Sequence, residues 1–425
     1  MVSSAYHLDD SDTFIQKALQ WASGFDCACY LDSNNYRDQY GNLHVFLAVG
    51  ESASFVSDGD NTFEKLQEFI DAHPQTWIPG FLGYDLKNEI EGLESRHPNH
   101  TGFPDAYFFV PATVLLIGRY NVEIKGNDPQ NIYQEIVRTE VTNAPVEFHG
   151  HLHYRMNRQA YFEAFSHMQR HIQQGDIYEV NLCQEFYSEH TALQPLEAYR
   201  KLNELSPTPF SCFFKYGQKY ILSASPERFL SKNGRTLLSQ PIKGTAPRGK
   251  NAEEDQQLKA DLLANPKEIS ENIMIVDLVR NDLTRSAQPG TVKASELLQV
   301  HSFKQVHQLV STVTCQLRDG LSPTTAIRDT FPPGSMTGAP KISAMKLIDR
   351  YEHSRRGIYS GAIGYFSPMG NFDFSVVIRT MLYNAENGYL SFHTGGAITG
   401  NADPHREYNE CLLKGKALFE VLKSH

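Results

Sequence analysis

The chain has 425 residues, 40% of them hydrophobic, so it can bury the core of one large domain or of two ordinary ones. Its formal net charge of -10 argues against a nucleic acid or an anionic membrane surface as the main partner, because both require a local excess of Lys and Arg. The six cysteines lack metal-type CxxC spacing, and the opening MVSSAYHLDD lacks the basic and apolar parts of a signal peptide. We therefore expect a globular, cytoplasmic protein with reduced thiols that acts on small molecules or proteins.

Residues 1–150 are expected to form a variable scaffold with a possible regulatory role, because they carry few polar motifs. The spacing of Phe14, Ala18 and Trp21 predicts a helix, and VFLAV predicts a strand. The longest apolar run, YFFVPATVLLIG, contains Pro111 and is shorter than the about 20 residues that cross a bilayer, so it predicts buried strands. A boundary near residue 150 is expected from the polar stretch that precedes it.

Residues 151–425 carry the sharper patterns and are expected to hold the function. Asn157 can cap a helix with apolar positions at helical spacing, and Gly175 can end that helix. The stretches GDIYEVNLCQEFY and KYILSASPERFL predict strands. Periodicity alone therefore indicates a mixed α and β architecture.

The stretch PIKGTAPRG places one amine on a constrained turn. Lys243 has Pro241 shortly before it and Gly244 directly after it, and both restrict where its side chain can point. A solvated lysine in a tight turn is the simpler interpretation. Other residues have to decide between this interpretation and a lysine that is held in place for a function.

Two carboxylate pairs occur at helical spacing. In PKEISENIMIVDLVRND, the apolar Ile269, Ile273 and Val276 share one stripe, while Glu268 and Glu271 lie on a neighbouring face at i,i+3. Charges that point toward a core are costly unless they are paired or bind a metal. This helix therefore supplies two candidate metal ligands.

The same spacing recurs in REYNECLLKGKAL. Glu407, Glu410 and Lys414 share a face that continues into Leu418 and Val421. A surface helix with an i,i+4 pair between Glu410 and Lys414 is the alternative, but it does not explain two such carboxylate pairs. Oxygen ligands without His or Cys suit a hard cation, which favours Mg²⁺ over Zn²⁺.

Possible anion-binding groups follow one another near the C-terminus. Strict alternation in FDFSVVIRTMLY predicts one strand in which Arg379 has apolar neighbours. Such an arginine can form a structural ion pair, or it can bind a substrate carboxylate through two nitrogens. In SFHTGGAITG, Gly395 and Gly396 are expected to end a strand and to let a ligand approach backbone amides.

The segment from FPPGSMTGAPK to VVIRTM, followed by TGGAITGNADPHREYNECLLKGKA, strongly resembles the chorismate-utilising enzymes. The resemblance runs from about residue 155 to the C-terminus. It implies one α+β unit in which antiparallel sheets pack face to face inside helices, with the substrate cleft between them. It also implies Mg²⁺ bound by Glu271 and Glu410, with Glu268 and Glu407 reaching the ion through water.

The resemblance assigns roles to further residues. Glu227, in SASPERF, matches the acid that protonates the leaving C4 hydroxyl, which requires a raised carboxyl pKa. His307, in VHQLVSTV, matches a histidine near the reacting ring, although by itself it would be interpreted as a core histidine. The positions that match substrate-binding residues are Glu179, Thr245, Tyr359, Arg379, Gly395, Gly396, Ala397 and Lys414.

Lys243 distinguishes between branches of the family. Members that form anthranilate resemble PIAGT here, whereas members that form aminodeoxychorismate resemble PIKGT. The implied chemistry is attack of the lysine amine on C2 of chorismate, after which ammonia enters at C4 and expels the lysine. An ordinary lysine is protonated at neutral pH, so we expect the site to lower the pKa of Lys243.

Departures from the family pattern narrow the reaction further. Isochorismate and salicylate synthases have a lysine at the position of Glu179, so water attack at C2 is disfavoured, although ammonia-using relatives usually have glutamine there. Asn272 and Ala397 also depart from the common residues. A glutamine amidotransferase segment is not evident, so ammonia is expected from a partner subunit or from solution. The alternatives are an anthranilate synthase component I and a non-catalytic chorismate-binding subunit.

Overall fold

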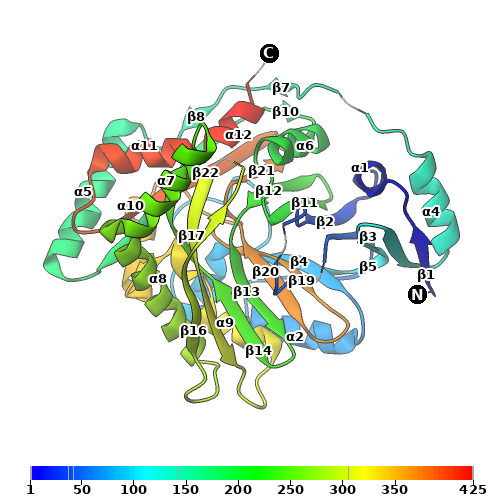
Figure 1. Ribbon diagram of the computed structural model, residues 1–425, viewed down its shortest axis with the longest axis horizontal. Coiled ribbons are helices and arrows are strands. Elements are labelled where there is room, and N and C mark those ends of the chain that lie inside the picture. Colours follow the sequence, from blue (N-terminus) through cyan, green and yellow to red (C-terminus); the bar gives the residue numbers. More distant parts are fainter. Residues whose placement is uncertain (1, 37, 42, 143, 305, 424–425) are drawn as a thin grey trace.

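The computed structural model describes residues 2–36, 38–41, 43–142, 144–304 and 306–423. Helices surround antiparallel strands, so the predicted α+β class is confirmed (Figure 1). Within these residues, no helix is both long and apolar enough to span a membrane. All six cysteines are buried and free, as the sequence predicts for reduced thiols.

The main sheet extends in two directions from β5 (Ala106–Ile117), which pairs with β3 (Val45–Val56) and with β4 (Ile78–Leu82). We call the strands reached through β3 the first wing and those reached through β4 the second wing. In pairing order, the first wing continues through β2 (Cys27–Asp32), β11 (Phe210–Tyr216), β12 (Lys219–Ser225), β21 (Thr380–Asn384), β22 (Tyr389–Ile398) and β9 (Glu179–Ser188).

The second wing continues in pairing order through β19 (Ala362–Phe366), β20 (Phe372–Val376), β13 (Arg228–Asn233), β14 (Thr236–Gln240) and β17 (Val306–Gln316), which pairs with both β15 (Ile242–Pro247) and β16 (Lys293–Ser302). Short strands complete the edges: β1 (Val2–His7), β6 (Asn121–Gly126), β8 (His153–Tyr154) and β18 (Gly338–Ala339). A separate pair is formed by β7 (Phe148–His149) and β10 (Ala192–Leu193).

The two wings pack face to face through one apolar cluster. Cys29, Phe46 and Phe214 of the first wing lie in this cluster with Phe81 and Ile363 of the second. The outer face of the first wing packs against α1 (Ser11–Ser23), α4 (Pro129–Arg138), α6 (Pro195–Leu205) and α12 (Lys416–Val421). The outer face of the second wing packs against α2 (Thr62–Ala72), α8 (Pro266–Thr284) and α9 (Pro323–Thr330).

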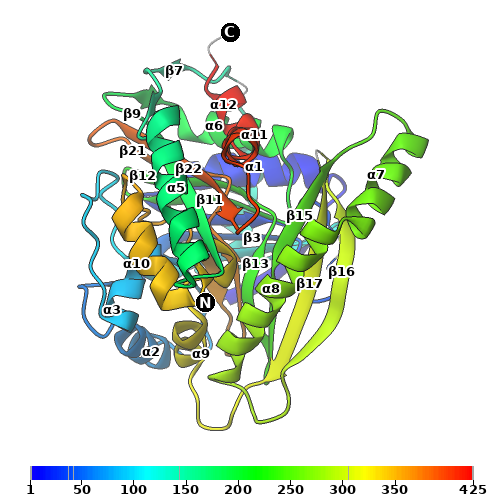
Figure 2. The same cartoon turned by 90° about the vertical axis from the view of Figure 1, so that its left-hand side faces the viewer.

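Further helices close one side of the molecule, which faces the viewer in Figure 2. They are α5 (Arg158–Gln174), α7 (Ala252–Ala264), α10 (Lys341–Tyr351) and α11 (Pro404–Lys414). The short elements are α3 (Lys87–Glu91) and the 3-10 turns η1 (Tyr84–Leu86) and η2 (Gly334–Met336). The helix predicted from Asn157 to Gly175 is confirmed: Asn157 accepts a hydrogen bond from the Ala160 amide, and Gly175 ends the helix with a positive φ.

Strands from both sides of residue 150 belong to the same sheet. β2 pairs with β11, and β4 pairs with β19. The two regions therefore share one hydrogen-bonded sheet. A scaffold role for residues 1–150 and a catalytic role for residues 151–425 stay predictions.

Two predicted strands are in fact pairs of strands that cross between the wings. KYILSASPERFL separates into β12 and β13 at Pro226 and Glu227, and FDFSVVIRTMLY separates into β20 and β21 at residues 377–379. The prediction of one alternating strand through Arg379 is wrong, because Arg379 adopts a φ of +51° where the chain leaves the second wing. The crossovers lie side by side: the Ala224 amide donates to the Arg379 carbonyl at 3.1 Å, and the Val376 amide donates to the Glu227 carbonyl at 3.0 Å.

The apolar stripe expected on α8 is also partly wrong. Ile273 is 46% exposed, whereas Asn272 is fully buried. The Asn272 amide donates to the carbonyls of Lys243 and Leu309 at 3.0 and 3.2 Å, and it accepts a hydrogen bond from Ser311. Asn272 therefore fastens α8 to the two strands beneath it, and the buried face of the helix turns toward it.

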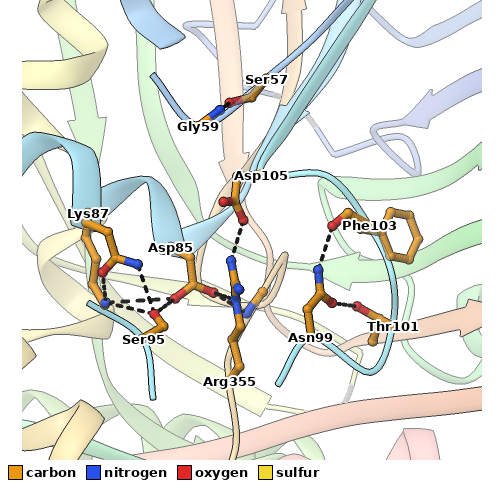
Figure 3. A network of polar contacts seen from close by, with 12 residues as sticks. Ser57, Gly59, Asp85, Lys87, Ser95, Asn99, Thr101, Phe103, Asp105 and Arg355 are labelled. Carbon is orange, nitrogen blue, oxygen red and sulfur yellow. Dashed lines mark hydrogen bonds and ion pairs between the residues drawn. The ribbon is translucent and has the colours of Figure 1, made fainter. Parts of the chain in front are cut away.

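A buried polar network joins the N-terminal region to the loop that precedes Tyr359 (Figure 3). Asp85 accepts a hydrogen bond from Arg355 at 2.8 Å and another from the Gly357 amide at 3.0 Å. The buried Lys87 ammonium lies 3.8 Å from the same carboxylate. Because burial lowers the pKa of Lys87, its charge depends on Asp85 for compensation.

We expect Asp85→Asn to destabilise the protein by about 3 kcal/mol, because the substitution removes the buried counter-ion of Lys87 and leaves Arg355 only its pair with Asp105. Asp58→Asn is the matched control, since Asp58 pairs with Lys65 at the surface, where solvent screens the pair, and its loss should cost far less stability. Denaturant unfolding of the three proteins measures both values. Equal losses for the two variants would contradict a structural role for the network.

Candidate active site

Lys243 lies on a bulge of β15 and points toward β9 of the other wing. Its ammonium lies 3.0 Å from Glu179, and only 14% of the Lys243 side chain and 3% of the Glu179 side chain are exposed. Gly244 has a φ of +98°, and a side chain there would lie 2.9 Å from Leu309 and 3.3 Å from Glu268. The glycine after the lysine is thus required by backbone conformation and by space, and the interpretation of a solvated surface lysine is wrong.

The expectation that the site lowers the pKa of Lys243 is not met by the side chains alone. Burial lowers this pKa, but the carboxylates of Glu179, Glu271 and Glu410 raise it by more than burial lowers it. The net shift of the Lys243 pKa is therefore upward. Lys243 is therefore a cation paired with Glu179. One oxygen of Glu179 is buried without a hydrogen-bond partner, so this carboxylate retains a free acceptor.

Glu227 and Arg379 occupy the adjacent crossovers between the wings. Burial raises the pKa of Glu227 to about 7, against the opposing effects of the Ser335 hydroxyl and the cations of Lys243 and Arg379. Burial lowers the pKa of Arg379 to about 10, while Glu227 raises it. Within the described residues, the Arg379 guanidinium has no ion pair within 4.0 Å, so the structural ion pair considered from the sequence is not formed.

The glycine segment lies inside β22 and not beyond its end, which corrects the sequence prediction. Gly395 faces Cys183 of β9, and a side chain at Gly395 would lie 2.4 Å from the Leu182 carbonyl. At Gly396, the nearest atom would be a Glu407 oxygen at 3.0 Å. The small residues thus let the carboxylates of α11 approach the strand.

Tyr359, in the loop before β19, and Lys414, at the end of α11, both lie next to this strand. The buried Tyr359 ring stacks on His393 with centroids 4.9 Å apart, and its hydroxyl lies 3.5 Å from Cys183. Lys414 donates to the Gly395 carbonyl at 3.1 Å and pairs with Glu410 at 2.8 Å. The i,i+4 pair that the sequence offers as an alternative is therefore formed, but it lies at the same strand as the other predicted site residues.

The two predicted carboxylate pairs are brought together by Lys267, which sequence analysis missed. Its ammonium lies 3.6 Å from Glu271 on its own helix and 3.5 Å from Glu407 on α11. Burial and mutual repulsion raise the pKa of Glu268 and, to about 7, that of Glu407. We call Glu268, Glu271, Glu407 and Glu410 the carboxylate cluster.

The donor set of the carboxylate cluster fits a hard cation, because it consists of carboxylate oxygens alone. One oxygen of Glu271 is buried without a hydrogen-bond partner and has the Lys267 ammonium 3.6 Å away, so its negative charge is only weakly compensated. However, no three His, Cys, Asp or Glu side chains among the described residues converge closely enough to hold a metal ion, and Lys267 and Lys414 pair with members of the cluster. Metal binding by the cluster would thus require its carboxylates to approach one another.

His307 lies on β17 opposite Ala246 of β15, and its ring has other partners than these groups. It is fully buried, with one ring nitrogen 2.9 Å from Asp255 and the other 2.9 Å from the Ser302 hydroxyl. These contacts fit the core histidine considered from the sequence, and a role near the reacting ring stays a prediction. The predicted substrate residue Thr245 is exposed on β15, where it pairs in register with Gln308.

A cavity of about 730 Å³ lies elsewhere, between the segment from Ser33 to His44 and the strands β15 to β17, and none of the predicted site residues lines it.

Comparison with known proteins identifies the family. A model of the chorismate binding enzymes matches residues 26–420. The chain belongs to this family.

Relatives of the chain include both aminodeoxychorismate synthases and anthranilate synthases. The aminodeoxychorismate synthase of Streptomyces griseus is 46% identical over 81% of this chain, which spans only half of that relative. The aminodeoxychorismate synthase component 1 of Escherichia coli K12 is 34% identical, covering 88% of this chain and 85% of the relative. The anthranilate synthase component 1 of Thermus thermophilus is 33% identical, covering 89% and 85%.

The fold is also that of a solved family member. The crystal structure of anthranilate synthase component I from Streptococcus pneumoniae superposes with a TM-score of 0.74 at 25% identity, covering 92% of this chain and 96% of that one. The predicted fold of antiparallel sheets packed inside helices is therefore confirmed.

In this chorismate binding enzyme, the raised pKa of Glu227 predicts a pH-dependent stability. A carboxyl whose pKa rises from 4.5 to about 7 on folding favours the folded state at low pH, and this advantage is lost as pH rises through 7. Glu227→Gln should therefore gain up to about 3 kcal/mol relative to the parent between pH 5 and pH 8. Denaturant unfolding at several pH values measures this difference.

Glu185→Gln is the control, because the neighbouring His393 and Arg155 side chains and hydrogen bonds from Tyr389 and Ser391 lower the pKa of Glu185 in spite of its burial. The stabilisation that Glu185 contributes is lost only as pH falls below about 4.5, so the difference between this variant and the parent should stay constant from pH 5 to pH 8. A flat difference for Glu227→Gln as well would show that Glu227 is not held as a neutral acid.

Proposed function

We propose that this chain is an aminodeoxychorismate synthase component 1, which aminates chorismate at C4 to form 4-amino-4-deoxychorismate. The observation that carries the proposal is the Lys243 amine, which the bulge of β15 holds in the same site as Glu179, Glu227 and the carboxylate cluster. Alanine occupies this position in the anthranilate-forming pattern. The name and the 46% identity of the Streptomyces griseus relative agree with this assignment.

The cations and the glycine segment are proposed to bind the substrate carboxylates. Arg379 is half-buried and has no ion-pair partner among the described residues, so a carboxylate that approaches it gains charge-assisted hydrogen bonds without breaking an ion pair. Lys414 lies beside the Gly395 carbonyl and can turn from Glu410 to a ligand. The remaining predicted contacts are Thr245, Tyr359, Gly396 and Ala397.

Glu271 and Glu410 are proposed to bind Mg²⁺ directly, with Glu268 and Glu407 binding it through water. When bound, Mg²⁺ supplies positive charge that neutralises these carboxylates and attracts a carboxylate of the substrate. The unpartnered oxygen of Glu271 and the mutual repulsion within the cluster support this assignment.

The chemistry is proposed to begin with transfer of a proton from Lys243 to Glu179. The free amine forms a bond to C2 of chorismate, the ring double bonds shift, and the C4–O bond breaks as Glu227 protonates the departing hydroxyl to water. Ammonia then forms a bond to C4, the double bonds shift back, and the C2–N bond breaks to release Lys243. The proton that the new ammonium loses restores Glu227, so the net reaction consumes ammonia and produces water.

We further propose that a glutamine amidotransferase subunit supplies the ammonia in the cytoplasm, because both bacterial relatives of similar length are named as a component 1. In this proposal residues 151–425 carry the catalytic groups, and residues 1–150 complete the sheet that positions them. An anthranilate synthase component 1 is the second candidate, which the Thermus thermophilus relative favours. A non-catalytic chorismate-binding subunit would bind the substrate without turnover.

Product identification separates these candidates. Purified protein incubated with chorismate, Mg²⁺ and ammonium should form 4-amino-4-deoxychorismate, recognised by its mass and absorbance. Formation of anthranilate alone would contradict the proposal, and binding without turnover would favour the non-catalytic alternative.

Lys243→Ala should reduce the amination rate by ~1000-fold or more, because the variant lacks the nucleophile. Lys250→Ala is the matched control, since Lys250 lies on the exposed end of the same turn and should leave the rate unchanged. Digestion of quenched parent enzyme should yield a modified peptide that contains Lys243. Unchanged kinetics of Lys243→Ala at saturating ammonium would show that the lysine is not the nucleophile.

A further inference from the structure

Lys267 is a cation placed where a helix disfavours one. It is the second residue of α8, whose N-terminus carries a partial positive charge from the aligned peptide dipoles. A lysine here is destabilising unless nearby negative charge compensates it. The four members of the carboxylate cluster provide that charge, since Glu271, Glu407, Glu268 and Glu410 all raise the pKa of Lys267, although burial lowers it.

Lys267 lies on the solvent side of two buried carboxylates. Its side chain is 50% exposed, whereas those of Glu271 and Glu407 are 13% and 4% exposed. The ammonium thus approaches both carboxylates from the solvent side and bridges two helices. Its distances of 3.6 and 3.5 Å are long for charge-assisted hydrogen bonds, so the contact is electrostatic and loosely held.

We infer that Lys267 is a positioning residue that acts as an internal counter-ion of the carboxylate cluster and is displaced when a divalent cation binds. This inference rests on the proposed metal site. The flexible four-carbon stem allows the ammonium to turn into solvent, at the loss of two weak ion pairs. Lys267 therefore reduces the repulsion between the carboxylates when no metal is bound. Because the cation has to displace it, Lys267 also lowers the affinity of the cluster for the cation.

The test is calorimetric titration of Mg²⁺ into metal-free protein, which requires no turnover. Lys267→Met should bind Mg²⁺ about two- to tenfold more tightly than the parent, the range that two half-exposed ion pairs supply. Lys267→Arg keeps the charge and should bind Mg²⁺ like the parent. Lys346→Met is the control for net charge, because Lys346 is exposed on α10.

A second measurement excludes a merely structural role. In the presence of EDTA, Lys267→Met should melt about 1–2 °C below the parent, and saturating Mg²⁺ should abolish this difference. Magnesium affinity of Lys267→Met that equals or falls below the parent's would overturn the inference while leaving the metal site intact. Absence of Mg²⁺ binding to the parent would overturn both the inference and the proposed metal site.

Discussion

The site depends on the two backbone hydrogen bonds that join the crossovers between the wings. Through them the chain passes twice from one sheet to the other at the same place, once at Glu227 and once at Arg379. A carboxyl group and a guanidinium are thereby fixed side by side at the junction of the two wings. Burial raises the pKa of Glu227 to about 7, and Arg379 is half-buried without an ion pair among the described residues. Packing of the wings thus sets both the position and the protonation of these groups.

A second constraint is the balance of charge around the buried amine. Glu179 alone would hold Lys243 as a cation, and the carboxylate cluster strengthens that hold at longer range. Positive charge added at the carboxylate cluster weakens the effect of the cluster on the Lys243 pKa, but it leaves the effect of Glu179 unchanged. In the proposed reaction, loss of the Lys243 proton would therefore depend on the short contact with Glu179, one oxygen of which pairs with the amine while the other has no hydrogen-bond partner. A glutamine at residue 179 would remove this acceptor, so the departure from the usual residue favours a more basic site.

Local patterns in the sequence predicted those elements whose environment is uniform. The helix from Asn157 to Gly175 has one buried face and explicit caps, and it was predicted to the residue. Alternation failed at Arg379, because a crossover between sheets imposes a backbone conformation that no hydrophobic period encodes. The prediction of which face of α8 is buried was partly wrong, because the hydrogen-bonded amide of Asn272 is buried where an apolar side chain was expected.

The candidate site was harder to predict than the fold, because its properties arise from groups far apart in sequence. The carboxylates of α8 and α11 were predicted from spacing, but Lys267 was missed, since an isolated lysine gives no pattern. The side chains alone shift the pKa of Lys243 upward, against the expected direction, because three carboxylates that the sequence does not place around the amine outweigh its burial. Pairwise distances across helices determine both properties.

The same fold supports anthranilate synthases, so the fold does not select the product. In the proposed reaction, the product depends on the side chain at residue 243, on a bulge whose geometry Gly244 makes possible. Under this proposal the Lys243 amine would bond to C2 and leave C4 for ammonia, whereas the anthranilate-forming pattern has alanine there and would leave C2 open to ammonia. The position of amination would then follow from which nucleophile reaches C2, within a fold that both kinds of enzyme share.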